Sequence, residues 1–217
     1  LDEISAAVLR DHGCTPSFLG YHGFPATICA SPNSAIVHGI PDNYRLVEGD
    51  IISIDAGAIY EGWHGDAAFT MAVGQVPDVV QRLLDATEQA MWAGIEQAVA
   101  GKRLGDVGHA IEQIGNAAGF GVVREYIGHG IGRQMHEKPE VPNYGKPKTG
   151  YKLKTGMAIA IEPMFNLGTA DTDVLDDGWT VVTADGSLSA HFEHTVALTE
   201  EGSKVMTLLE PVLVGQK

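Results

Sequence analysis

The chain has few basic residues, few cysteines and no long apolar segment. Its 217 residues include 14 Lys and Arg against 28 Asp and Glu, which gives a formal net charge of −14. No run of basic residues is long enough to follow a phosphate backbone, so we expect no nucleic-acid partner. Two cysteines, Cys14 and Cys29, form no disulfide framework or thiolate metal site, which favours a reducing, cytoplasmic compartment.

Membrane and secretory signals are also missing from the sequence. No apolar run approaches the roughly 18 to 20 residues that span a bilayer, and the first residues lack the pattern of a signal peptide. The length suits one hydrophobic core, so we expect a single domain over residues 1–217. Leu1 already falls inside a helical pattern, and we therefore expect the natural chain to begin before it.

Two segments of the chain repeat one pattern of a turn, an apolar strand and a carboxylate. These segments are residues 46–55, which end at Asp55, and residues 153–162, which end at Glu162. The same spacing of 107 residues places His22 onto His129. The match predicts an internal duplication, with related halves at about 1–76 and 101–200.

Helices and a hairpin are predicted around these strands. Apolar residues at helical spacing predict helices over 2–12, 77–99 and 104–119. Residues 50–60 and 63–73 read as an antiparallel hairpin, and a register in which paired numbers sum to about 121 would place Asp55 opposite Asp66. One sheet face would then carry both carboxylates.

The second half adds two more acids to this face. Glu162 ends its strand, and Glu193 lies in a strand expected over 189–198, after a connection through 171–186. Four carboxylates in one place repel one another unless cations lie between them. Two divalent ions would balance the charge, with Asp66 and Glu193, one from each half, as the bridging pair.

A nitrogen ligand is expected from the glycine-rich segment around His129, where the backbone can approach a metal closely. Oxygen ligands with one imidazole suit Mn, Fe, Co or Zn. Paired metal ions about 3.5–4 Å apart characterise hydrolases that include aminopeptidases and phosphatases. A phosphatase is disfavoured because basic residues that would hold a phosphoryl group are lacking. By spacing alone, His38 and His136 fit surface loops, as do the histidines at 12, 22, 64, 109, 191 and 194.

Six motifs resemble one known family. They are NSAIVHGIP (33–41), IDAGAIYEGWHGD (54–66), GHGIGRQMH (128–136), IEP (161–163), GWTV (178–181) and FEHT (192–195). Over residues 15–199 the chain resembles the type I methionine aminopeptidases. The resemblance implies an α+β pita-bread fold, with two pseudo-twofold halves around a curved antiparallel sheet. It also implies removal of the initiator methionine from nascent polypeptides whose second residue is small.

The resemblance assigns roles to twelve residues. It implies a two-metal ligand set with two bridging members, Asp66 and Glu193, completed by Asp55, His129 and Glu162. Glu162 would also move the proton of the attacking water, and His38 and His136 would contact the substrate around the scissile amide. The methionine pocket would be formed by Tyr21, Phe24, Cys29, Met135 and Trp179. Phe24 and Met135 stand where the family more often has Tyr and Phe, so the shape of the pocket is expected to differ.

Other interpretations remain open at this stage. An X-Pro aminopeptidase or prolidase shares the fold and the five ligands, although such relatives generally carry a large additional domain. A non-catalytic binding protein of the same fold is the other alternative, although all five expected ligands are present here. The substrate would be the N-terminal peptide of a nascent chain. We expect the enzyme to be a monomer that meets this substrate in transient proximity to the ribosome.

Overall fold

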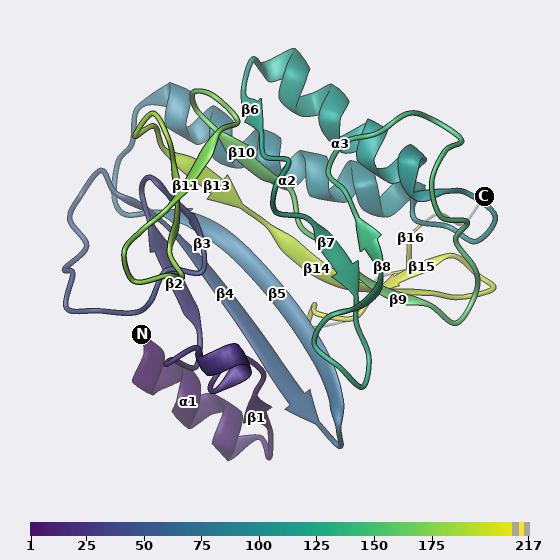
Figure 1. The fold of residues 1–217 in the computed structure, drawn as a ribbon, viewed down its shortest axis with the longest axis horizontal. Helices are drawn as coiled ribbons and strands as arrows, with labels where there is room; N and C mark the ends of the chain where they lie inside the picture. Colours follow the sequence, from purple (N-terminus) through teal and green to yellow (C-terminus); the bar gives the residue numbers. More distant parts are fainter. Residues whose placement is uncertain (210–212, 215–217) are drawn as a thin grey trace.

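The computed structural model describes residues 1–209 and 213–214 (Figure 1). Its helices are α1 (Asp2–Asp11), α2 (Asp78–Gln97), α3 (Leu104–Ala118) and the short 3-10 helix η1 (Tyr21–Gly23). Its strands are β1 (Thr15–Pro16), β2 (Cys29–Pro32), β3 (Ala35–Val37), β4 (Ile51–Tyr60), β5 (Trp63–Ala72), β6 (Gly121–Val122), β7 (Gly128–Gly130), β8 (Glu137–Val141), β9 (Ala158–Ile161), β10 (Met164–Asn166), β11 (Thr172–Val174), β12 (Val181–Thr183), β13 (Ser189–His191), β14 (Glu193–Leu198), β15 (Ser203–Val205) and β16 (Leu213–Val214).

One large curved sheet organises the molecule. Its strands follow the order β1-β4-β5-β14-β9-β7-β8, with β2 on β4, β15 on β14 and β16 on β15. Two small sheets, β13-β10-β6 and β11-β12-β3, lie beside it. The recorded pairings in all three sheets are antiparallel. Helices and antiparallel sheets together confirm the predicted α+β class.

Helices α2 and α3 lie side by side against one face of the large sheet (Figure 1). Their apolar stripes are buried together with residues of β9 and β10, including Ile161 and Phe165. The bounds of both helices match the predicted ranges to within two residues. Both helices end close to the predicted residues because the burial of one helical face, more than local propensity, decides the length of each helix.

Helix α1 is present as predicted, but its apolar stripe is not buried. No residue of α1 is buried, and Ile4 is 66% exposed. The carboxylate of Asp2 accepts hydrogen bonds from the backbone N–H groups of Thr27 and Ile28. A polar contact therefore holds the start of this helix in the described chain.

The hairpin of β4 and β5 has a register that differs from the prediction by two residues. Asp55 lies opposite Ala68, and Asp66 lies opposite Gly57. Because side chains alternate faces with a period of two, a shift of two residues keeps both carboxylates on the same face. The predicted pairing of Asp55 with Asp66 was wrong, whereas their shared face is confirmed.

The predicted strand over residues 189–198 is divided between two sheets. Its first part, β13, pairs with β10, and its second part, β14, pairs with β5 and β9. The hydroxyl of Thr70 donates to the carbonyl of His191 at 2.9 Å and accepts from the N–H of His191 at 2.8 Å. The crossing point is thereby hydrogen-bonded to β5 although the ladder is interrupted there.

Helix α3 packs closely against the loop of residues 142–150. A Cβ at Gly108 would overlap the carbonyl oxygen of Tyr144, and a Cβ at Gly105 would overlap that of Lys146. Only residues without a side chain allow the helix and the loop to approach this closely.

We therefore expect Gly108→Ala to destabilise the protein by about 1–3 kcal/mol, because the added methyl group overpacks a backbone contact. Gly65→Ala is the matched control, since a Cβ at Gly65 meets nothing within 4 Å. Urea unfolding followed by circular dichroism measures both variants. Equal stability of the two variants would contradict the packing described for α3.

Candidate metal centre

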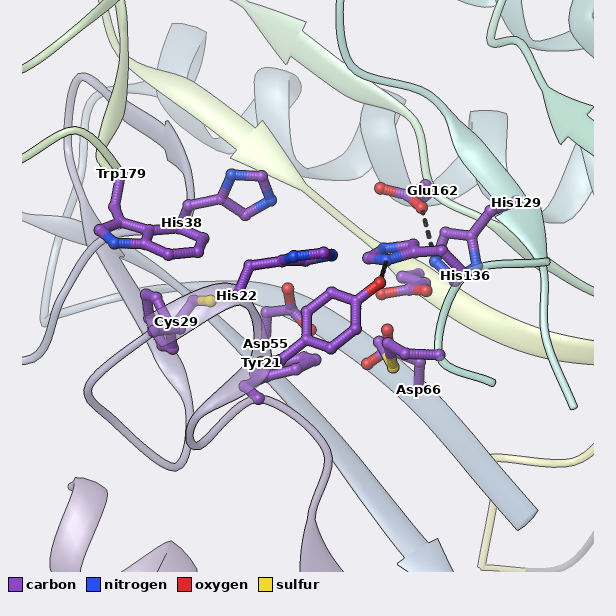
Figure 2. A pocket seen from close by; sticks show the side chains of 14 residues that line it. Tyr21, His22, Cys29, His38, Asp55, Asp66, His129, His136, Glu162 and Trp179 are labelled. Carbon is purple, nitrogen blue, oxygen red and sulfur yellow. Dashed lines mark hydrogen bonds and ion pairs between the residues drawn. The ribbon is translucent and has the colours of Figure 1, made fainter. Parts of the chain in front are cut away.

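Five adjacent strands of the large sheet each bring one candidate ligand to the same place. In the order β4-β5-β14-β9-β7 these are Asp55, Asp66, Glu193, Glu162 and His129, with Glu162 directly after the end of β9. Figure 2 shows most of them gathered at one end of a pocket. The large sheet therefore assembles the set from residues far apart in the sequence.

A small side chain makes room for the acids. Both Asp55 and Glu193 lie opposite Ala68, and Cys29 lies opposite Asp55 on the other side. Ala68 is buried between the two carboxylate-bearing strands. A larger residue at this position would fill the space that the carboxylates share.

The ligand atoms lie at distances that one ion could bridge. Asp66, His129 and Glu193 each offer an atom within 4.8 Å of the others, and all three are buried. The Nε2 atom of His129 is 3.6 Å from Oε1 of Glu162. Asp66 and Glu193 are only 3% and 2% exposed, so water cannot solvate their charges fully.

Several oxygens of this cluster have no hydrogen-bond partner. Oδ1 of Asp55, Oδ1 of Asp66 and Oε1 of Glu193 are buried and unpartnered among the described residues. Buried polar atoms in native proteins nearly always have a partner. Divalent cations would supply one, and four carboxylates with one imidazole fit ions such as Mn, Fe, Co or Zn.

The charges of the acids oppose one another. Burial, followed by the charges of Asp66 and Glu162, raises the pKa of Asp55 well above its usual value. Burial and the neighbouring carboxylates do the same for the pKa of Glu193, and burial raises the pKa of Asp66 to about 7. The folded protein thus needs protons or cations at this position.

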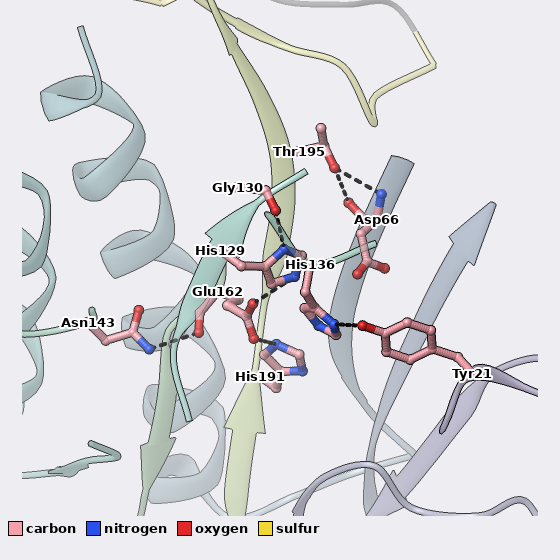
Figure 3. Close-up of polar contacts among 9 residues, drawn as sticks. All are labelled: Tyr21, Asp66, His129, Gly130, His136, Asn143, Glu162, His191 and Thr195. Atoms are coloured by element: carbon pink, nitrogen blue, oxygen red, sulfur yellow. Dashed lines mark hydrogen bonds and ion pairs between the residues drawn. The ribbon is translucent and has the colours of Figure 1, made fainter. Parts of the chain in front are cut away.

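Hydrogen bonds around the cluster orient its members (Figure 3). Nδ1 of His129 lies 2.9 Å from the carbonyl oxygen of Gly130, which can only accept, so Nδ1 carries the proton and Nε2 is free to bind a metal. The hydroxyl of Thr195 bonds both the N–H and the carbonyl of Asp66 at 2.9 Å. Asn143 donates to the carbonyl of Glu162.

An apolar pocket opens beside the acids. Its volume is about 270 Å³, and the expected pocket residues Tyr21, Phe24, Cys29, Met135 and Trp179 all line it. The ring of Phe24 meets that of Trp179 edge-on at 5.1 Å. Phe18 and His22 line the pocket as well and were not predicted.

His38 and His136 line the same pocket as the acids, with His38 near Trp179 and His136 near Glu162 (Figure 2). Nδ1 of His136 is 2.7 Å from the hydroxyl of Tyr21, and its ring packs 4.2 Å from the ring of His129. His38 adopts a φ of 59°, a left-handed conformation that is uncommon outside glycine. The two histidines that spacing alone would leave on the surface therefore line the site, as the resemblance implied.

The loop that carries Met135 and His136 is fastened to the turn of the β4–β5 hairpin. The guanidinium of Arg133 stacks on the ring of Trp63 at 3.9 Å and donates to the carbonyl of Glu61 at 2.8 Å. The N–H of His64 donates to the carbonyl of Gly132. The first half of the chain thus supports a wall of the pocket that the second half supplies.

Sequence comparisons identify metallopeptidases as relatives of this chain. The profile of metallopeptidase family M24 matches residues 1–200. The chain belongs to metallopeptidase family M24. It is 55% identical over 215 residues to "Methionine aminopeptidase 1" of Mycobacterium tuberculosis, covering 96% of this chain and 81% of that protein. It is 50% identical over 210 residues to "Methionine aminopeptidase" of Clostridium perfringens, covering 97% and 84%.

Solved structures of M24 relatives confirm the pita-bread fold. The methionine aminopeptidase from Rickettsia prowazekii superposes with a TM-score of 0.93 at 44% identity, over 95% of this chain and 84% of that one. A prolidase from Pyrococcus furiosus gives 0.68 at 26% identity, over 84% of this chain and 49% of the prolidase. Within the described residues, no helix of this M24 protein is long and apolar enough to cross a membrane.

His191 corrects one expectation from the sequence. It was expected on the surface, yet it is 1% exposed and its Nε2 lies 3.8 Å from Oε2 of Glu162. His191 precedes Glu193 by two residues in an apolar strand pattern, and this period could have placed it on the same face. Three further histidines are part-buried: His64 bonds Ser17, His194 packs on Trp92, and His109 lies in α3. His12 and His22 are exposed as expected.

The raised pKa of Asp66 predicts how the metal-free M24 protein responds to pH. Its carboxyl titrates near 3.8 when unfolded and at about 7 when folded and metal-free. The folded state therefore binds the proton more tightly, and this contribution to stability is present below pH 3.8 and lost as the pH rises through about 7.

We expect the thermal midpoint of EDTA-treated protein to fall between about pH 6.5 and pH 8, and to fall less with saturating Mn²⁺. At lower pH the buried histidines, whose pKa values are lowered in the folded state, act in the opposite direction. Differential scanning calorimetry in both conditions measures this difference. A metal-free midpoint that rises across the range would contradict the electrostatics described for the acids.

Proposed function

We propose that this chain removes the N-terminal methionine from polypeptides whose second residue is small, with two divalent cations in the carboxylate cluster. The observation that carries the proposal is the apolar pocket that opens directly beside five convergent ligand side chains. The names of the relatives with 50% identity or more agree with this activity.

Five side chains would hold the ions in this proposal. Asp55, Asp66, His129, Glu162 and Glu193 would form the ligand set, with Asp66 and Glu193, on the neighbouring strands β5 and β14, as the members that both ions would share. Four carboxylates balance two divalent charges. When bound, such ions polarise the carbonyl of the scissile bond and ready a water for attack. The metal would be Mn, Fe, Co or Zn.

The protein's own side chains bind and orient the substrate. The pocket offers aromatic rings and the sulfur atoms of Cys29 and Met135, which are soft surroundings that suit an unbranched thioether. Tyr21, Phe24 and Trp179 close around it. The scissile amide of a bound peptide would then lie at the boundary between the pocket and the acids.

His38 and His136 lie at that boundary and would hydrogen-bond the reacting amide. Burial lowers the pKa of His38 to about 4 and also lowers the pKa of His136, so both rings are neutral at pH 7. A neutral ring donates one hydrogen bond without repelling the positively charged amino terminus of the substrate. Glu162 would hold the proton that the attacking water gives up.

A proline-directed peptidase is the second candidate. The prolidase similarity supports it as a fold, but this chain spans only 49% of that prolidase and matches methionine aminopeptidases at higher identity. A non-catalytic binding protein would not need unpartnered buried oxygens on three acids. Both alternatives are therefore weaker.

The wider setting of the enzyme is part of the same proposal. We place residues 1–217 in one domain made of two related halves, acting as a monomer in the cytoplasm. Its substrates would be the amino termini of nascent chains, met transiently near the ribosome.

Two variants separate metal binding from substrate contact. Asp66→Ala should abolish turnover and metal binding together, because it removes a shared ligand. His136→Ala should lower turnover by about 100-fold or more while metal content stays near that of the unaltered protein. Metal analysis by mass spectrometry and peptide turnover measure both effects. Full activity of the Asp66 variant, or parallel loss of metal in the His136 variant, would contradict these roles.

A peptide panel tests the substrate class. Peptides beginning Met-Gly, Met-Leu, Leu-Gly and Gly-Pro are incubated with the protein and each of Mn, Fe, Co and Zn. We expect cleavage of Met-Gly and little cleavage of the others, since the pocket fits methionine and the second residue must be small. Preferred cleavage of a proline-containing peptide would favour the second candidate.

A further inference from the structure

A second cavity adjoins the site on the far side of the histidines. Its volume is about 230 Å³, and it shares His38, His129, His136 and Glu162 with the methionine pocket. Its other described lining residues are Val37, Glu125, Tyr126, Ile127 and Met164. The two cavities therefore meet at the residues that would surround the scissile bond.

This juxtaposition sets the path of a bound peptide. If the first side chain fills the methionine pocket and the scissile amide lies at the shared residues, the rest of the chain leaves through the second cavity. An extended residue advances about 3.3–3.6 Å, so the Cα atom of the third residue lies about 5 Å beyond the scissile bond. That distance carries it from the shared inner residues towards the rim.

The inner walls of the second cavity are apolar. Val37 and Met164 are buried, and the ring of Tyr126 stands perpendicular to that of His38 at 5.7 Å. These groups carry no charge at pH 7. They leave selection by charge to the outer part of the cavity.

The outer part carries one exposed carboxylate, that of Glu125. Its neighbour Arg124 turns elsewhere, pairing with Glu112 at 2.5 Å and stacking over Tyr144 at 4.3 Å. Among the described residues, no Lys, Arg or His nitrogen lies within 4 Å of the Glu125 carboxylate. The carboxylate is therefore available to a charge on the substrate.

We propose that Glu125, at the rim of the second cavity, selects a basic over an acidic third substrate residue. The inference rests on the proposed function, whose substrate class it narrows. Exposed ion pairs are weak, so the preference is modest, about two- to fivefold in kcat/KM. Because such pairs are screened, the preference shrinks at high salt.

The test compares Met-Ala-Lys-Ser, Met-Ala-Gln-Ser and Met-Ala-Glu-Ser with the metal-loaded protein. We expect kcat/KM to fall in that order. The Lys-to-Glu ratio is kcat/KM for Met-Ala-Lys-Ser divided by kcat/KM for Met-Ala-Glu-Ser. Glu125→Gln should lower this ratio, because the variant has no charge at the rim, and Glu125→Lys should invert it. Met-Ala-Gln-Ser serves as the reference peptide, so that a general loss of turnover in Glu125→Gln is separated from a change in the Lys-to-Glu ratio.

The net charge of −14 attracts every basic peptide, so the control must remove the same charge elsewhere. Glu88→Gln does so on the exposed face of α2 and should keep the full ratio. Equal ratios in Glu125→Gln and Glu88→Gln would overturn the inference while leaving methionine removal intact. Failure of the unaltered protein to cleave any of the three peptides would instead overturn the proposed function.

Discussion

The mutual repulsion of four clustered carboxylates, two of them buried and two half-buried, is the constraint on which this structure depends. Asp55, Asp66, Glu162 and Glu193 lie in one place with little access to water, and three of their oxygens have no partner among the described residues. Such a cluster is tolerated only where bound positive charge or protons offset it. The surrounding architecture can be understood as the means of holding these acids together.

The curved sheet provides that means with regular geometry. Four neighbouring strands carry one candidate ligand each, and the fifth, β9, is followed directly by Glu162. The spacing between strands, about 4.8 Å, therefore sets the spacing between the candidate ligands. Ala68 leaves the space between Asp55 and Glu193 open, and the hydroxyl of Thr195 fixes the backbone of Asp66. Helices α2 and α3 support the sheet and carry none of the five candidate ligands.

Sequence reasoning predicted the parts of the fold and site that follow from periodicity. The helices were predictable because their buried stripes recur every three to four residues. The common face of Asp55 and Asp66 was predictable although their register was not, because an error of two residues preserves the face. The division of β13 from β14 was not predicted, because nothing local marks Phe192 as the point where the chain changes sheets. His191 was missed although its spacing of two residues from Glu193 was visible in the sequence. The pocket residues came from family resemblance, since aromatic and sulfur side chains in loops look like ordinary core.

The Arg133 stack on Trp63 has a consequence for how the pocket keeps its depth. Trp63 follows an exposed two-residue turn, while Arg133 lies in a loop that supplies Met135 and His136. A displacement of that surface turn would be transmitted to the floor of the cavity without any change in the carboxylates. The depth available to a substrate side chain thus depends partly on a contact between two residues that do not line the cavity, Arg133 and Trp63.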